Sequence, residues 1–118
     1  MDEVSKEALT LLAFLYLEYF KYDKALTLLK ALHILYPDDL NIMRSLAYAH
    51  LKNRDYQSSL RFSEACLKNE TSKESKIAAN IIKSKALWGL GKEEAARHTI
   101  MQAIPHNPPN PKLESSPS

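Results

Sequence analysis

The sequence predicts an all-α protein built from three successive pairs of helices. The chain of 118 residues contains only two glycines, and it lacks the alternation of apolar and polar residues that is typical of strands. It also contains an internal repeat, because residues 12–16 (LAFLY) recur as residues 46–50 (LAYAH) at an offset of 34. A period of this length accommodates two helices and their turns in each unit.

The repeat continues downstream of these segments. Residues 21–26 (KYDKAL) align with residues 55–60 (DYQSSL), again 34 apart, and more loosely with residues 91–96 (GKEEAA) at a further offset of 36. The two extra residues are expected in the polar stretch of residues 68–75. The predicted repeat units cover about residues 6–39, 40–75 and 76–104.

One domain is expected to span residues 1–104. The overall composition, 45% hydrophobic and 25% charged, is ordinary for a single globular domain. From Pro105 the composition changes to mostly Pro, Asn and Ser. Such a segment cannot bury enough apolar surface to offset the entropy that ordering costs. Residues 105–118 are therefore predicted to form a disordered tail.

Local signals mark where several of the helices begin and end. Asp38 and Asp55 can accept hydrogen bonds from the free N–H groups at the starts of the third and fourth helices. Thr71 stands three residues before Glu74, which is the spacing of a capping box at the start of the fifth helix. Gly89 and Gly91 flank Leu90, so the fifth helix is expected to end there in a left-handed residue, which glycine adopts readily.

Several classes of function are excluded by composition. A net charge of +2 gives no strong basic surface, so no nucleic-acid partner is expected. The apolar residues 9–20 follow acidic residues and are too few to cross a bilayer, which takes about 20. We interpret them as a buried helix and expect no membrane insertion. The single Cys66 predicts a buried, structural thiol and a reducing, cytoplasmic location.

No catalytic or metal-binding pattern is present in the sequence. The four histidines have neither the helical i, i+4 spacing nor the Cys/His spacing of a metal site; they are His33, His50, His98 and His106. The adjacent acids at residues 38–39 and 93–94 lie at helix starts, where the helix dipole accounts for them. Glycine-rich phosphate loops and serine elbows are missing. We therefore expect no metal, no cofactor and no enzymatic activity.

The first unit resembles the tetratricopeptide repeat. The residues that carry the resemblance are Leu12, Ala13, Tyr16, Tyr22, Ala25, Leu29, Leu32 and Pro37. The second and third units match more weakly, with Ser63 and Thr99 among their substitutions. The resemblance implies three helix pairs stacked as a short right-handed solenoid with a concave groove.

The groove of such a stack is lined by the first helix of each pair, which is where ligands usually lie. Counting each unit from its start gives the candidate inward positions, which are mostly apolar: Phe14, Leu17, Tyr48, Leu51, Ser84 and Leu87, with Trp88 beside the last. The candidate polar positions on the same face are Arg44, Lys52 and Asn80. Large apolar groups here are expected to stay exposed until a partner fills the groove. The alternative is that they belong to an ordinary core.

A narrower resemblance covers roughly residues 9–107. Residues 14–18 (FLYLE), 24–32 (KALTLLKAL) and 35–40 (LYPDDL) are similar to the small chaperones of bacterial type III secretion systems, particularly those of the SctY (YscY-like) type. The segment of residues 91–103 fits the final helix pair of that family. The resemblance implies a bacterial cytoplasmic virulence chaperone that keeps an early secreted protein of the SctX type soluble and helps present it to the export gate.

In this interpretation an amphipathic helix of the SctX-type partner fills the groove. Two other functions remain open: a needle-subunit chaperone of the same system, and a general tetratricopeptide adaptor that reads a peptide carboxylate with Lys, Arg and Asn. Self-association of this chain through the groove is expected when the partner is absent, because contiguous apolar patches rarely stay exposed.

Overall fold

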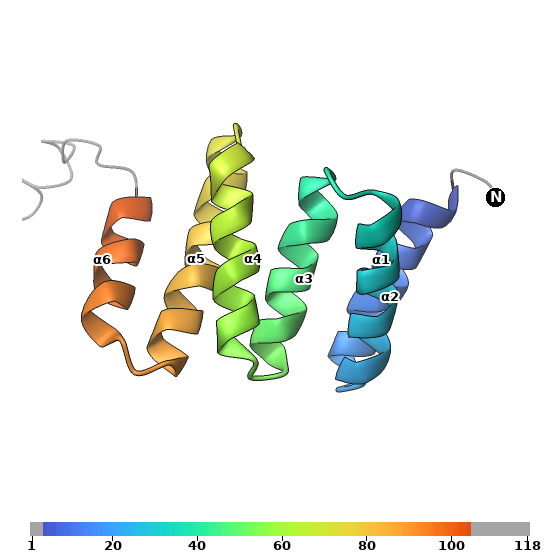
Figure 1. Cartoon of the computed structure of the whole chain (residues 1–118), viewed down its shortest axis with the longest axis horizontal. Coiled ribbons are helices and arrows are strands. Elements are labelled where there is room, and N and C mark those ends of the chain that lie inside the picture. The colour runs from blue at the N-terminus through green and yellow to red at the C-terminus, as the bar shows by residue number, and fades with distance from the viewer. Residues whose placement is uncertain (1–3, 105–118) are drawn as a thin grey trace, which may run out of the picture.

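The computed structural model describes residues 4–104, and Figure 1 shows that they form a row of packed helices. The six helices are α1 (Val4–Glu18), α2 (Tyr22–Leu35), α3 (Leu40–Lys52), α4 (Tyr56–Asn69), α5 (Lys73–Gly89) and α6 (Glu93–Ala103). Each helix packs against the next along the chain, and α3 also contacts α1 and α5. The predicted all-α class and six helices are confirmed, and the packing is consistent with a helical repeat. The predicted tail of residues 105–118 lies outside the described residues.

Side-chain caps begin three of the helices. Asp39 accepts hydrogen bonds from two backbone N–H groups of α3, at 2.9 and 3.2 Å. Asp55 accepts one at 3.2 Å at the start of α4, as predicted, and Ser72 accepts one at 3.1 Å at the start of α5. The predicted caps Asp38 and Thr71 are wrong by one residue. In both cases the following residue has the extended backbone that an N-cap requires.

The turn within each helix pair contains a residue with positive φ. Gly91 has φ of 81°, which confirms the predicted left-handed residue after α5. The corresponding turns after α1 and α3 use Phe20 at 62° and Arg54 at 64°. Side chains rarely adopt this conformation, so its recurrence shows that the three turns share one geometry.

The third pair is displaced by one residue from its predicted register. Asp55 and Lys92, the N-caps of α4 and α6, lie 37 positions apart rather than 36. The extra residues lengthen a helix, because α5 has 17 residues where α3 has 13. One residue turns a side chain by about 100° around a helix. The predicted positions on α5 therefore face a different direction from their intended counterparts on α3.

A hydrogen bond at each helix crossing confirms this offset of 37. The Ser59 hydroxyl donates to the carbonyl oxygen of Ala47 over 2.8 Å, where α4 crosses α3. Where α6 crosses α5, the Ser84 hydroxyl donates to the carbonyl oxygen of Ala96 over 2.9 Å. The two bonds join equivalent pairs of positions, with donor and acceptor exchanged. Close crossings of this kind require small residues on both helices.

The core is concentrated in the first two pairs. Its fully or almost fully buried members are Ala13, Leu17, Ala25, Leu26, Leu29, Leu32, Ile42, Leu46 and Ala49. The third pair contributes fewer residues: α5 buries Ala79, Ile82, Ala86 and Leu87, and α6 buries only Ala96 and Thr99 among its described residues. Most of the apolar burial that stabilises the fold therefore comes from α1 to α4.

The expectation that residues 9–20 form a buried helix is only half correct. They do form most of α1, and Ala13 and Leu17 are buried. However, Leu11 is 67% exposed and Leu15 is 48% exposed. These side chains point away from α3, on the outer face of the first pair. Within the described residues no further helix packs on this face.

Gly89 is required by a close approach of Tyr56. A Cβ atom at Gly89 would lie 2.6 Å from the Tyr56 ring, so a larger residue at position 89 would overlap with Tyr56.

We expect Gly89→Ala to lower the free energy of unfolding by about 1–2 kcal/mol, because relieving this overlap displaces the ring. Urea denaturation followed by circular dichroism measures the change. In a Tyr56→Ala background the same substitution should instead stabilise the protein, as alanine is the better helix former. Stabilisation in both backgrounds would show that the overlap is unimportant.

Candidate functional site

Three adjoining pockets lie along α1, α3 and α5. The upper pocket, of 390 Å³, is lined by residues that include Thr10, Phe14, Arg44 and Ile82. The side pocket, of 520 Å³, includes Phe14, Leu17 and Lys52. The lower pocket, of 770 Å³, includes Leu51, Lys52 and Trp88. Tyr48 lines all three, so we treat them as one surface and name it the α1–α3–α5 groove.

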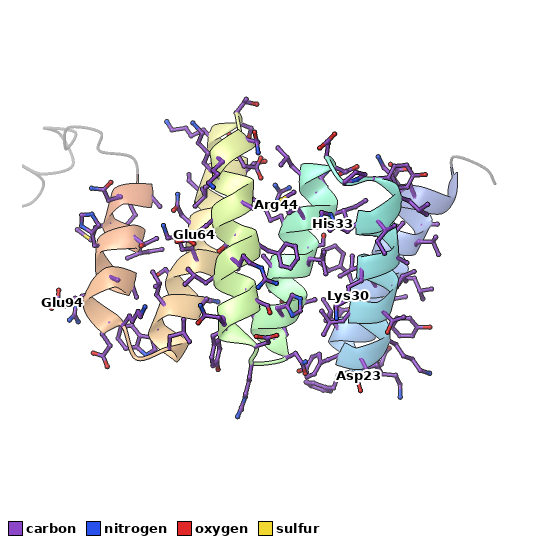
Figure 2. The ribbon with its side chains drawn as sticks, viewed as in Figure 1. Asp23, Lys30, His33, Arg44, Glu64 and Glu94 are labelled. Carbon is purple, nitrogen blue, oxygen red and sulfur yellow. The ribbon has the colours of Figure 1, made fainter. Side chains whose placement is uncertain are left out.

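The figures present the side of the molecule on which α2 and α4 lie. In Figure 1, α2 and α4 are drawn in front of α1 and α5. Figure 2 labels charged residues on this front face, including Lys30 of α2 and Glu64 of α4. The three pockets are lined mostly by residues of α1, α3 and α5, and the lower pocket is also lined by Tyr22 of α2 and Tyr56 of α4.

Two aromatic rings form the centre of the groove. The ring centroids of Phe14 and Tyr48 are 6.2 Å apart, with the planes tilted by 50°. Phe14 remains 37% exposed, whereas Leu17 is buried beneath the groove. Leu17 therefore supports the surface and is not a free apolar group, contrary to expectation. Leu51 is half-buried at the edge of the lower pocket.

The third pair contributes different residues from those predicted. The Ser84 hydroxyl faces α6, where it bonds to Ala96, and Leu87 is only 6% exposed. Neither lines the groove. The one-residue register shift explains both errors, because it brings Lys85 and Trp88 to the positions equivalent to Tyr48 and Leu51.

Trp88, a predicted site residue, does line the lower pocket and is 53% exposed. Lys85 was missed by the sequence analysis. The positive-φ residues of the turns identify Lys85. Aligning Gly91 with Arg54 gives an offset of 37, and this offset places Lys85 at the position equivalent to Tyr48. The groove positions on α5 follow from that alignment.

The three predicted polar residues do not converge on one point. Arg44 lines the upper pocket, but its guanidinium already donates to the Glu70 carboxylate, whose side chain is only 4% exposed, and to the Asn41 side chain. Lys52 lies at the other end, with its Nζ 6.0 Å from the centroid of the Tyr48 ring. Asn80 lines none of the three pockets.

Two histidines pack between helices around one phenylalanine. The His50 ring stacks on Phe62 at a centroid distance of 5.6 Å, and His33, labelled in Figure 2, meets the same ring edge-on at 5.7 Å. Burial lowers the pKa of His50, although the carboxylate of Asp55 opposes this effect. Both side chains act as interhelix packing groups. His98 is exposed on α6, and His106 lies outside the described residues.

Residues 4–104 contain no cluster of three or more His, Cys, Asp or Glu side chains arranged to hold a metal ion. The ion pairs of this part of the chain instead join helices or stabilise helix surfaces. An example is the pair between Lys83 of α5 and Glu64 of α4, whose Nζ and Oε2 atoms are 3.6 Å apart. Two buried imidazole nitrogens of this region, Nδ1 of His33 and Nδ1 of His50, have no hydrogen-bond partner.

Cys66 is fully buried on α4, as predicted for a structural thiol. Burial, together with the nearby Glu70 carboxylate, raises the pKa of the thiol from 9.0 to about 11.

The raised pKa of Cys66 makes the stability of the protein depend on pH, because the unfolded chain loses the thiol proton at lower pH than the folded protein does. We expect the free energy of unfolding to decrease as pH rises from about 9 to 11. Guanidinium denaturation across this range, compared with Cys66→Ala, measures the contribution, and identical pH profiles for both proteins would contradict it.

None of the helices in residues 4–104 has the length and apolar character needed to cross a membrane.

Comparison of the chain with protein-family models and with curated proteins finds no match. The fold described here is therefore that of a small protein of six helices packed as sequential pairs, with one multi-pocket groove along its first, third and fifth helices.

Proposed function

We propose that this protein is a type III secretion chaperone of the SctY type. In this proposal the helix pairs are three tetratricopeptide repeats stacked as a short right-handed solenoid, and the α1–α3–α5 groove is its concave face. The groove binds an amphipathic helix of an early secreted protein of the SctX type, keeps it soluble in the bacterial cytoplasm and helps present it to the export gate.

The exposed aromatic line of the groove carries this proposal. Phe14, Tyr48 and Trp88 come from three different helices and remain partly or largely exposed beside adjoining pockets. Apolar side chains of a bound helix would cover them, and each buried large side chain contributes about 1.5–3 kcal/mol before the costs of association. Helix-in-groove binding uses this arrangement of apolar anchors.

Co-expression tests the proposal directly. The chain is produced together with an SctX-type protein, and the soluble fraction is analysed by size-exclusion chromatography with mass determination. We expect a stoichiometric complex and a gain in solubility of the SctX-type protein. A chain that stays alone while the candidate partner precipitates would contradict the proposal. Capture of a needle subunit in a parallel arm would support the needle-subunit chaperone instead.

The general adaptor function is less well supported. It requires Lys, Arg and Asn side chains to meet around one peptide carboxylate. Arg44 is already paired with Glu70, and Asn80 lies outside the three pockets. Of the three predicted polar residues, only Lys52 both lines a pocket and lacks an ion-pair partner within the described residues.

A further inference from the structure

The lower pocket of the groove carries a concentration of positive charge. Its lining includes Lys52 at the end of α3, Arg54 in the following turn and Lys85 on α5. The other described lining residues are Tyr22, Tyr48, Leu51, Asn53, Tyr56, Trp88 and Gly89. Among these described residues none carries a negative charge. The pocket is therefore cationic and aromatic.

These three cations are not neutralised by the rest of the described structure. Within residues 4–104, no carboxylate forms an ion pair with Lys52, Arg54 or Lys85. Four other cations of this region have carboxylate partners, namely Lys6, Arg44, Lys83 and Arg97, and several more, such as Lys30 and Lys68, have none within it. What distinguishes the lower pocket is that three unpaired cations line one pocket. The lower pocket thus keeps a positive potential that an incoming group can satisfy.

The two ends of the groove differ in charge. In the upper pocket the one cationic lining residue, Arg44, is paired with Glu70, and the neighbouring groups include Phe14 and Ile82. The side pocket contains Glu18 as well as Lys52. Uncompensated positive charge is therefore confined to the lower end. A bound helix would meet an apolar surface along most of its length and cations at one end.

We propose that the lower pocket binds side-chain carboxylates at one end of an acidic amphipathic helix. The helix places its apolar stripe on Phe14, Tyr48 and Trp88, and its Asp or Glu residues lie between Lys52 and Lys85. This assignment rests on the proposed function, and it adds the chemistry of the partner and the end at which its acidic residues lie. Because Lys52, Arg54 and Lys85 are exposed, their attraction to the carboxylates is expected to be modest and sensitive to salt.

Binding of matched synthetic peptides to the full-length chain tests this assignment. Four 18-residue amphipathic helices share one apolar stripe and carry a fluorescent label. Three have blocked ends and differ only in having four Glu, Gln or Lys residues at one end. The fourth is the Gln peptide with a free C-terminal carboxylate. Fluorescence anisotropy gives their affinities at 50 and 300 mM NaCl.

The Glu peptide is expected to bind about tenfold more tightly than the Gln peptide at 50 mM NaCl, and the Lys peptide more weakly than either. The advantage should shrink at 300 mM NaCl, because salt screens exposed charges. Lys85→Glu should remove most of it. The matched control Lys30→Glu changes an exposed residue of α2 that lines none of the three pockets (Figure 2), and it should retain the advantage.

Equal affinity for the Glu and Gln peptides would overturn the assignment. An equal loss of binding in Lys30→Glu and Lys85→Glu would overturn it too, since net charge alone would then explain the effect. A higher affinity confined to the peptide with a free C-terminal carboxylate would overturn the assignment too, because the pocket would then bind a chain terminus and not side-chain carboxylates. Absence of binding by all four peptides also counts against the assignment.

The co-expression experiment separates this inference from the proposed function. A stable complex with the SctX-type protein whose yield is unchanged by Lys85→Glu and by 300 mM NaCl would leave the chaperone function standing and remove the acidic-helix assignment. If the chain captures the acidic peptide but not the SctX-type protein, the pocket assignment survives and the chaperone identity fails.

Discussion

Replacing Leu46 by alanine is expected to lower the free energy of unfolding by about 3 kcal/mol. Leu46 has no exposed surface and lies at the middle of α3, which contacts more helices than any other element described. The substitution removes apolar contacts and leaves a cavity that its neighbours cannot fill without moving the surrounding helices. For a domain whose total stability is about 5–15 kcal/mol, this is a large fraction.

Chemical denaturation followed by circular dichroism measures this loss. The matched control is Leu11→Ala, which deletes the same atoms from a side chain that is 67% exposed and should change stability by less than about 0.5 kcal/mol. Similar losses from the two variants would mean that the outer face of α1 is covered in solution. A negligible loss from Leu46→Ala would contradict the packing of α3 described above.

Tyr48→Asp is expected to abolish capture of the SctX-type partner while leaving the helical content nearly unchanged. Tyr48 is the one residue that lines all three pockets of the groove. A carboxylate at this position would have to be desolvated against the apolar surface of a bound helix, and it would replace an aromatic anchor. Leu51→Asp, at the edge of the lower pocket, should have the same effect.

Pull-down from co-expressing cells, with circular dichroism of the purified variants, distinguishes loss of binding from loss of folding. Tyr19→Asp makes the same chemical change at a residue that is 71% exposed and lines none of the three pockets, so it should retain capture. Normal capture by both Tyr48→Asp and Leu51→Asp would place the binding surface elsewhere on the molecule.

The sequence was sufficient to predict the helices because their signals are local. The apolar periodicity and the acidic cap at Asp55 act over a few residues, and so does the glycine at position 91. Each is independent of distant parts of the chain. The errors at Asp38 and Thr71 are of one residue, which is the usual uncertainty where two adjacent residues can both cap a helix.

The groove was less predictable because it depends on register across repeats. Phe14, Tyr48 and Lys52, predicted from the offset of 34 between the first two units, do line the pockets. In the third unit the longer α5 makes the offset 37 instead of the predicted 36. The prediction therefore named Ser84, which faces α6, in place of Lys85, which lines the lower pocket. The unpaired charge of the lower pocket was therefore not visible from the sequence.

Burial at Leu17 and Leu87 could not be judged from spacing alone. Whether a residue at a groove position is exposed depends on how closely the neighbouring helices approach, and small residues such as Ala13 and Ala86 bring them near. The pairing of Arg44 with Glu70 is a further case, because it joins a residue of α3 to the C-cap residue of α4, 26 positions away. Such contacts depend on the tertiary arrangement.

The uncovered outer face of the first pair makes the two ends of this protein unequal for engineering. Positions 12 and 15 expose leucine there, whereas the equivalent positions of the second unit, Leu46 and Ala49, are buried under the first pair. The outer surface of α6 instead carries charged groups such as Glu94 and Arg97. An additional helix pair fused ahead of α1 would find an apolar surface on which to pack. The array can therefore be lengthened at one end by addition alone, while growth at the other end requires redesign of α6.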